Sequence, residues 1–114
     1  MNVSTITKLA AKMMGDAGGS VWAPAVMVDY VKPAVNRLLD DRPDLLLATT
    51  GLIAQDTIVE ALTSTSELPD SITGSHSLAL SHMVCHLCYI EDADETANEK
   101  LAAGHLALYE KAVS

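Results

Sequence analysis

The residues most able to do chemistry form one short run in which histidine and cysteine recur at helical spacing. His82, Cys85 and His86 lie three or four residues apart, so they would share one face of a helix. Cys88 follows one turn after Cys85. Imidazole nitrogens and thiolates are ligands that zinc prefers. The run is therefore the one candidate metal cluster of the sequence.

The spacing of this cluster argues against a metal site. Structural zinc sites draw two ligands from each of two segments, and one helix cannot wrap four ligands around a metal ion. His76 or His105 would have to complete the coordination. Buried cysteines and hydrogen-bonded core histidines are common in folded proteins. We therefore expect these side chains to pack, with no metal and no cofactor.

A catalytic cysteine–histidine pair is another interpretation of the same run. A nucleophilic thiol needs a lowered pKa and access to its substrate. Cys85 and Cys88 lie in the most apolar stretch of the chain, where burial raises a thiol pKa instead. We therefore predict that the chain is not an enzyme.

Carboxylates near Arg42 are the remaining acid–base candidates. Asp40 and Asp44 flank this arginine where a predicted helix ends. Paired carboxylates can transfer protons, but acids at a helix end are usually solvated or paired with a base. We expect a solvated helix end, in which Arg42 makes an ion pair with one of these carboxylates or with a group across an interface.

The elements that position these residues are predicted to be mainly helices, about four in number. Apolar residues three and four apart predict a first helix from about residue 4 to residue 14. A second helix is predicted from Trp22 to about residue 41, because Pro24 suits its first turn and Pro43 stops it.

The second helix pair is predicted at about residues 75–90 and 94–112. No Lys, Arg, Asp or Glu occurs between Ser71 and Ile90, so the third helix is apolar nearly all round and should be buried nearly all round. That makes it either a central core helix or a helix shared with a neighbouring subunit. The fourth helix has one narrow predicted apolar stripe, made by Ala97, Leu101, His105, Leu108 and Ala112.

The middle of the chain is predicted to be a short β region. Residues 45–47 and 57–63 each read as a short strand, the second because of its β-branched residues. We expect a small β-hairpin or an extended arm there. The whole chain is then a single helical domain with a first helix pair in 1–43, the β or loop region in 44–70, and a second helix pair in 71–114.

Composition narrows the possible functions. The net charge is −8 and the seven Lys and Arg residues are scattered, which disfavours a basic surface for nucleic acids or anionic membranes. Apolar residues make up 49% of the chain, enough for a packed core. No apolar stretch approaches the length of a membrane span, and the first residues do not read as a signal peptide. We expect a protein that is made and used in a cytoplasm.

Three segments together resemble one family. The first is the helix led by Trp22 that ends in Asn36-Arg37-Leu38-Leu39-Asp40-Asp41-Arg42-Pro43-Asp44. The second is the step Leu68-Pro69-Asp70, and the third is the closing pair of segments, residues 79–85 and 97–109. In this combination the chain resembles the head-to-tail connector adaptors of tailed double-stranded DNA bacteriophages.

This resemblance implies a structural protein of the virion neck, made in the host cytoplasm. It implies a homo-oligomeric ring, expected to be a dodecamer, that bridges the portal protein to a downstream tail or nozzle protein. Double-stranded DNA would pass through the lumen without specific binding, and an acidic chain suits such passage. The chain departs from longer members in its very short middle region and in the absence of charge from its third helix.

Candidate interface residues follow from the apolar helix, the tryptophan and the C-terminal tail. Trp22 is equally well read as a core anchor or as an interface anchor. The tail could dock on the portal through Tyr109, or it could complete the core of its own domain. The full candidate interface set is Trp22, Val84, Leu87, Leu108, Tyr109 and Val113.

Three alternatives remain open at this point. The chain could be a small helical dimeric regulatory or interaction protein of phage or bacterial origin. It could be a capsid-stabilising or tail-completion protein. A metal- or thiol-dependent enzyme is the third alternative, and metal analysis of the purified protein would test it.

Overall fold

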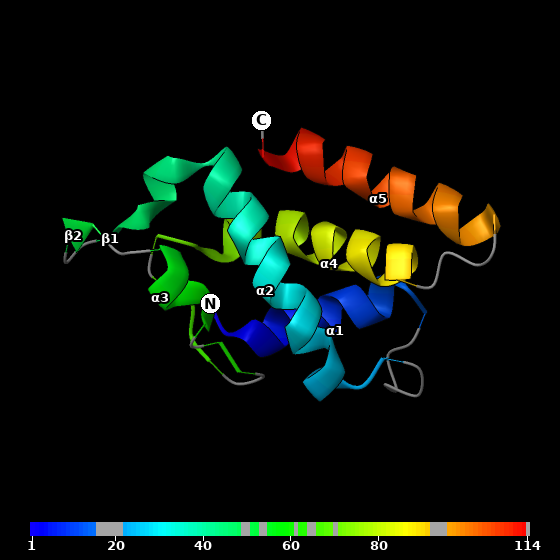
Figure 1. Cartoon of the computed structure of the whole chain (residues 1–114), viewed down its shortest axis with the longest axis horizontal. Coiled ribbons are helices and arrows are strands. Elements are labelled where there is room, and N and C mark those ends of the chain that lie inside the picture. Colours follow the sequence, from blue (N-terminus) through cyan, green and yellow to red (C-terminus); the bar gives the residue numbers. More distant parts are fainter. Residues whose placement is uncertain are drawn as a thin grey trace.

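The computed structural model of the chain is a helical bundle, and α4 runs through its centre (Figure 1). It describes residues 1–15, 22–48, 51–52, 55–60, 62–63, 66–69, 71–91 and 96–113. The main helices are α1 (Val3–Met13), α2 (Pro24–Asp41), α4 (Ser77–Glu91) and α5 (Thr96–Val113), and a short helix, α3 (Gln55–Glu60), lies in the middle of the chain. The predicted class, a small bundle of mainly α structure, is confirmed.

Helix α4 packs against α1, α2 and α5. Figure 1 shows it between α5 on one side and α1 on the other, while α2 crosses it. Leu80, Val84 and Cys85 have no solvent-exposed surface, because these three helices cover most of the circumference of α4. The charge-free stretch of the sequence therefore forms the central core helix of a single chain.

The ends of the first two helices follow local rules. The Asn2 side chain caps α1 by accepting a hydrogen bond from the backbone N–H of Ser4. Pro24 occupies the first turn of α2, where its missing N–H costs nothing. Helix α2 ends at Asp41 because Arg42 precedes a proline and leaves the helical conformation.

The predicted β-hairpin of residues 45–47 and 57–63 is wrong. Pro43–Leu46 form a 3-10 turn, and Gln55–Glu60 form α3. The strand pairing within the described residues is one short antiparallel contact between β1 (Leu47–Ala48) and β2 (Gly51–Leu52), together with an isolated bridge from Asn2 to Glu67. Burial of Ile58 and Val59 against the core outweighs their β preference, because propensity yields to tertiary packing.

The predicted apolar stripe of α5 is wrong in its register. Leu101 and Leu108 are 45% and 47% exposed, whereas Ala102 and Tyr109 are buried. The buried row is therefore displaced by one residue, which rotates the helix by about 100° relative to the expectation. His105 is half-buried at the edge of this row.

The ends of α4 also differ from the expectation of burial nearly all round. Leu78 near its start and Ile90 near its end are each 50% exposed. A short 3-10 turn, Gly74–His76, leads into the helix. In the part of the chain that the structure describes, no helix combines the length and the apolar character needed to span a bilayer.

Candidate functional site

The boundary between α4 and α5 holds the histidines that the sequence marks as chemical candidates. His82 of α4 and His105 of α5 face each other, with their Nδ1 atoms 2.9 Å apart. The ring of Tyr89, one and a half to two turns further along α4, stacks on His105 at a centroid distance of 5.7 Å. Burial lowers the pKa of His82, and burial together with His82 and His86 lowers the pKa of His105. Both rings are therefore neutral at pH 7.

His86 makes a second contact across the same boundary. Its Nδ1 lies 2.7 Å from the carbonyl oxygen of Ala102. A carbonyl only accepts, so this nitrogen carries the proton and donates it. Ala102 is buried and has a small side chain, which lets α4 and α5 approach closely here.

The two cysteines are packed rather than poised for reaction. Cys85 and Cys88 are fully buried, and burial raises the pKa of each thiol to about 12. The Cys85 thiol lies 3.5 Å from the carbonyl oxygen of Ala10 and 4.0 Å from the sulfur of Met13, both on α1. A thiol in this setting is a poor nucleophile, because the thiolate is the reactive form.

These residues do not form a metal-ligating group. No three His, Cys, Asp or Glu side chains within the described ranges lie where they could share a metal ion. His105 reaches His82, as a completed zinc site would require, but Cys85 points to α1 and the His86 nitrogen is occupied by a carbonyl. The arrangement is that of interhelical hydrogen bonds.

A second polar group joins α5 to the end of α2. The Tyr109 hydroxyl donates to Oδ2 of Asp41 at 2.7 Å, and the tyrosine side chain has no exposed surface. Arg37 bonds the same carboxylate at 2.9 Å, lies 5.5 Å from the Tyr109 ring centroid, and pairs with Glu110 at 3.8 Å. Burial and the Asp41 carboxylate both raise the pKa of Tyr109.

The candidate interface residues divide into inner and outer groups. Val84 and Tyr109 lie wholly inside this chain, so a partner docked on this fold would not touch their side chains. Leu108 is half-exposed on the outer side of α5. The remaining three, Trp22, Leu87 and Val113, are partly buried and pack against the core.

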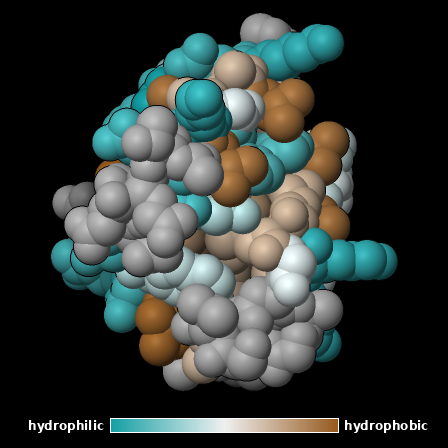
Figure 2. Space-filling model, turned by 90° about the vertical axis from the view of Figure 1, so that its right-hand side faces the viewer, coloured by the Kyte–Doolittle hydropathy of each residue, from teal (hydrophilic) through white to brown (hydrophobic). Residues whose placement is uncertain are grey.

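Trp22 lies just before α2 and makes an edge-to-face contact with Tyr30, with ring centroids 5.7 Å apart. It thereby anchors the start of α2 while part of its surface stays open. Figure 2 views the end of the molecule where α4 finishes and α5 begins, and there apolar surface alternates with hydrophilic surface.

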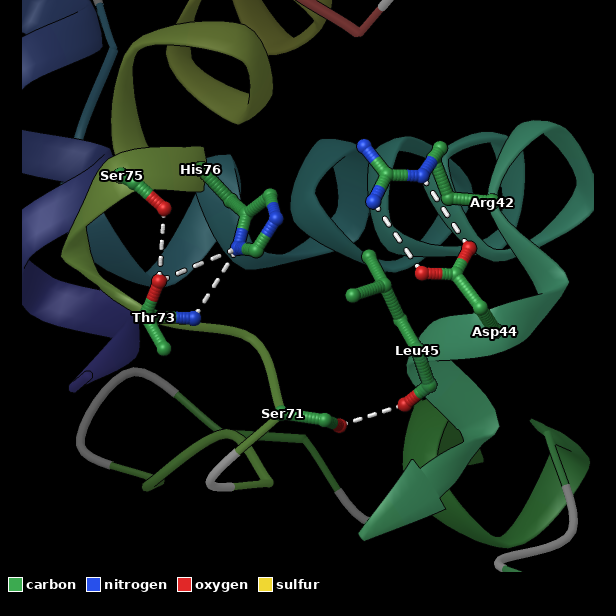
Figure 3. A network of polar contacts seen from close by, with 7 residues as sticks. All are labelled: Arg42, Asp44, Leu45, Ser71, Thr73, Ser75 and His76. Atoms are coloured by element: carbon green, nitrogen blue, oxygen red, sulfur yellow. Dashed lines mark hydrogen bonds and ion pairs between the residues drawn. The ribbon is translucent and has the colours of Figure 1, made fainter.

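At the end of α2, Arg42 pairs with one of its two flanking carboxylates. Arg42 makes two parallel contacts with Asp44, each 3.1 Å long, as Figure 3 shows. This pairing raises the pKa of Arg42 and lowers that of Asp44. Asp40 instead accepts a hydrogen bond from the side chain of Gln55, which also bonds Asn36 and so ties α3 to α2.

A hydroxyl and imidazole network lies beside this arginine (Figure 3). His76 accepts the backbone N–H of Thr73 at its Nδ1, 3.0 Å away, and the Thr73 hydroxyl lies 2.7 Å from that of Ser75. Ser71 donates to the carbonyl oxygen of Leu45. Because the backbone already uses the accepting nitrogen of His76, this ring cannot serve Ser75 as a general base. The contact from Ser71 to Leu45 fastens the segment before α4 to the 3-10 turn that follows α2.

Two pairings could not be read from the sequence. His82 meets His105 from 23 residues away, and Tyr109 meets Asp41 from 68 residues away. For the first, the sequence offered only that each of the two helices predicted to form the second pair carries a histidine. Chemically, the boundary of α4 and α5 can exchange protons and hold helices together.

No protein-family model matches the chain, no curated protein is significantly similar in sequence, and no solved structure is significantly similar in fold.

Proposed function

We propose that this chain is a structural adaptor subunit of a phage neck, which acts by binding other copies of itself and the portal protein. The observation that carries this proposal is the outer row of α5. Leu101 and Leu108 lie seven residues apart, two helical turns, so they share one face and are both about half exposed. The buried residues of the same helix include Ala102 and Tyr109 instead.

A single exposed leucine is ordinary on a protein surface. Two leucines on one helix face, with the exposed Ala112 one turn beyond Leu108, present apolar surface on either side of the half-buried His105. Such a surface suits a contact between subunits, because burying it removes apolar surface from water. A ring needs this kind of contact between two different faces of neighbouring copies.

The placement of the family-like segments also supports the proposal. The segment led by Trp22 and ending in Arg42-Pro43-Asp44 spans α2 and its stop, and the two closing segments lie in α4 and α5. The first and second helix pairs then pack together through α4. The net charge of −8 suits a channel through which DNA slides. The downstream tail or nozzle protein would bind the opposite side of the ring.

The test is assembly on the portal protein encoded in the same genome. Purified chain, alone and mixed with portal rings, is measured by light scattering and native mass spectrometry. We expect ring-sized assemblies with the portal, and we expect Leu101→Glu with Leu108→Glu to abolish them. Ala103→Glu, on an exposed position of the same helix, is the matched control and should still assemble.

Two outcomes would contradict the proposal. If the leucine variant assembles like the wild type, the outer row of α5 is not the contact. A stable dimer of the 12.1 kDa chain that ignores the portal would instead favour the small helical regulatory protein. A portal or capsid gene beside this one would independently favour the adaptor.

A further inference from the structure

The contact between His82 and His105 has a property that the other α4–α5 contacts lack. Its two Nδ1 atoms are 2.9 Å apart, the length of an N–H···N hydrogen bond. A neutral imidazole has one protonated and one bare nitrogen, so one ring donates here and the other accepts. The bond therefore requires one of the two facing nitrogens to be without a proton.

We propose that this histidine pair is a proton-sensitive latch between α4 and α5, closed near neutral pH and opened by mild acid. Opening would weaken the attachment of α5, whose Ala102 and Tyr109 are buried against the rest of the bundle. The latch consists of a contact within one chain, so it does not depend on the proposed assembly function, although His105 lies one turn from both Leu101 and Leu108.

The latch opens at the second of two protonation steps. The first added proton goes to the bare Nε2 of the donor ring and leaves the hydrogen bond intact. The second goes to the accepting Nδ1, so that two N–H groups and two positive charges then face each other. Like charges this close repel, and neither nitrogen can accept.

No opposite charge offsets this repulsion within the described part of the chain. Positions one turn from His82 in α4 hold Leu78, Ala79, Cys85 and His86, and those one turn from His105 in α5 hold Leu101, Ala102, Leu108 and Tyr109. The thiols and Tyr89 remain neutral in acid, since burial raises their pKa. None of the charged groups of the packed helices contributes to the shifts of the two rings. They are Lys8 and Lys12 of α1, Asp29, Lys32, Arg37, Asp40 and Asp41 of α2, Glu91 of α4, and Glu99, Lys100, Glu110 and Lys111 of α5.

The sign of the pH effect follows from the direction of the shifts. Both histidines have a lowered pKa in the folded chain, so below pH 6.5 the unfolded chain binds more protons than the folded one. The contribution of the neutral histidine pair to the free energy of unfolding is fully present above about pH 6.5. It is lost as the pH falls below that value. Each histidine changes the unfolding equilibrium constant by up to about tenfold for each pH unit below that point.

His86 provides an internal contrast. It donates Nδ1–H to the Ala102 carbonyl, 2.7 Å away, and protonating its other nitrogen leaves this bond in place. Acid therefore breaks one of the two histidine contacts across this boundary and keeps the other. The loosening is local to the position of His82 and His105.

The first experiment uses the wild-type chain and needs no variant. Nitrogen-detected NMR of the imidazoles reports which ring nitrogens carry protons between pH 7.5 and 5. We expect one of the two rings to have a bare Nδ1 at pH 7.5, and both rings to titrate below pH 6.5. Titration of the pair at or above pH 6.5, or protons on both Nδ1 atoms at pH 7.5, would overturn the latch.

The second experiment compares urea unfolding at pH 7.5 and 5.5. His82→Asn with His105→Asn can hydrogen-bond at either pH, so its acid-induced rise in the unfolding constant should be on the order of tenfold smaller than that of the wild type. His76→Gln, remote in the 3-10 turn before α4, should keep the wild-type rise. An equal rise in the double variant and the wild type would also overturn the proposal. If the double variant does not fold, the NMR titration decides.

Discussion

At the scale of single residues, polar side chains that resemble catalytic groups in the sequence form hydrogen bonds between helices. His86 bonds a carbonyl, the Tyr109 hydroxyl bonds Asp41, and the Cys85 thiol faces a carbonyl of α1. Each of these groups is at least partly buried, and a buried polar atom must find a partner. Residue type alone therefore could not distinguish a catalytic histidine or cysteine from one that packs in the core, since both roles place these side chains out of contact with solvent.

The thiols provide the first prediction. Because the pKa of Cys85 and Cys88 is about 12, the thiolate fraction at pH 8 is about a thousandfold lower than for a thiol with a pKa of 9. We expect iodoacetamide to label the native chain at least that much more slowly than the urea-unfolded chain. Because burial raises the pKa of both thiols, the protonated thiols contribute fully to the free energy of unfolding below about pH 9. This contribution is lost as the pH rises above that value.

The matched control for labelling is Ala103→Cys, which places a thiol at an exposed position of α5. This added thiol should react at the rate of an unfolded one. Rapid native labelling of Cys85 or Cys88 would show that α4 is accessible and would restore the possibility of thiol chemistry.

The hydrogen bond from Tyr109 to Asp41 gives the second prediction. Tyr109→Phe keeps the buried ring and removes the donor, so Asp41 loses one partner while Arg37 remains. Bonds to charged groups stabilise by about 1.5–3 kcal/mol, and partial solvation of Asp41 reduces this to about 1–2 kcal/mol. Urea unfolding of the variant measures the loss. A variant as stable as the wild type would mean that water replaces the bond.

At the scale of elements, α5 shows what a hydrophobic pattern leaves undetermined. Its sequence carries alanine and leucine on several faces, so two stripes one residue apart are nearly equally apolar. The larger ring of Tyr109 selects the buried face, because it fills more core volume and its hydroxyl reaches Asp41. The pattern alone could not include that long-range partner.

The register of α5 is tested by neighbouring alanines. Ala102 is buried at the boundary with α4, whereas Ala103 is exposed. Ala102→Gln forces a long polar chain into packed space and should cost about 2–4 kcal/mol. Ala103→Gln should change the free energy of unfolding by less than about 0.5 kcal/mol. Thermal and urea unfolding of the pair measure the difference, and equal losses would contradict the observed register.

At the scale of the whole molecule, helix positions were largely predictable and helix contacts were not. Pro24 and Pro43 mark the ends of α2 locally, and the charge-free run from Ser71 to Ile90 marks the central helix. The pairing of His82 with His105 depends on how α4 and α5 rotate against each other, which is a property of the packed chain. The middle of the chain was misread because burial of Ile58 overrode its strand preference.

The assembled bundle is compact and strongly acidic. Its Cα radius of gyration is 13.6 Å, close to the value of about 13 Å expected for a compact chain of this length. The net charge of −8 is confined within a molecule of 44 × 27 × 21 Å. Two excess charges about 20 Å apart in water repel by about 0.2 kcal/mol, and eight such charges form many pairs. Self-repulsion should therefore lower the stability of the isolated chain.

The salt dependence of the melting temperature shows whether this repulsion or the attraction within the surface ion pairs is the larger effect. Exposed pairs such as Arg37–Asp41 and Arg42–Asp44 stabilise by about 0.2–1 kcal/mol each, and salt weakens them too. The repulsion involves more pairs, so raising NaCl from 20 to about 300 mM should raise the melting temperature by several degrees at pH 7.5. At this pH the histidine latch is closed and does not contribute.

The control removes charge instead of screening it. Glu60→Gln with Glu99→Gln neutralises two exposed carboxylates on different helices. This variant should melt higher than the wild type at 20 mM NaCl and should gain less from added salt, because less repulsion remains to be screened. A wild-type melting temperature that falls as NaCl rises would show that the ion pairs outweigh the net charge, and that the acidity of this chain does not oppose its folding.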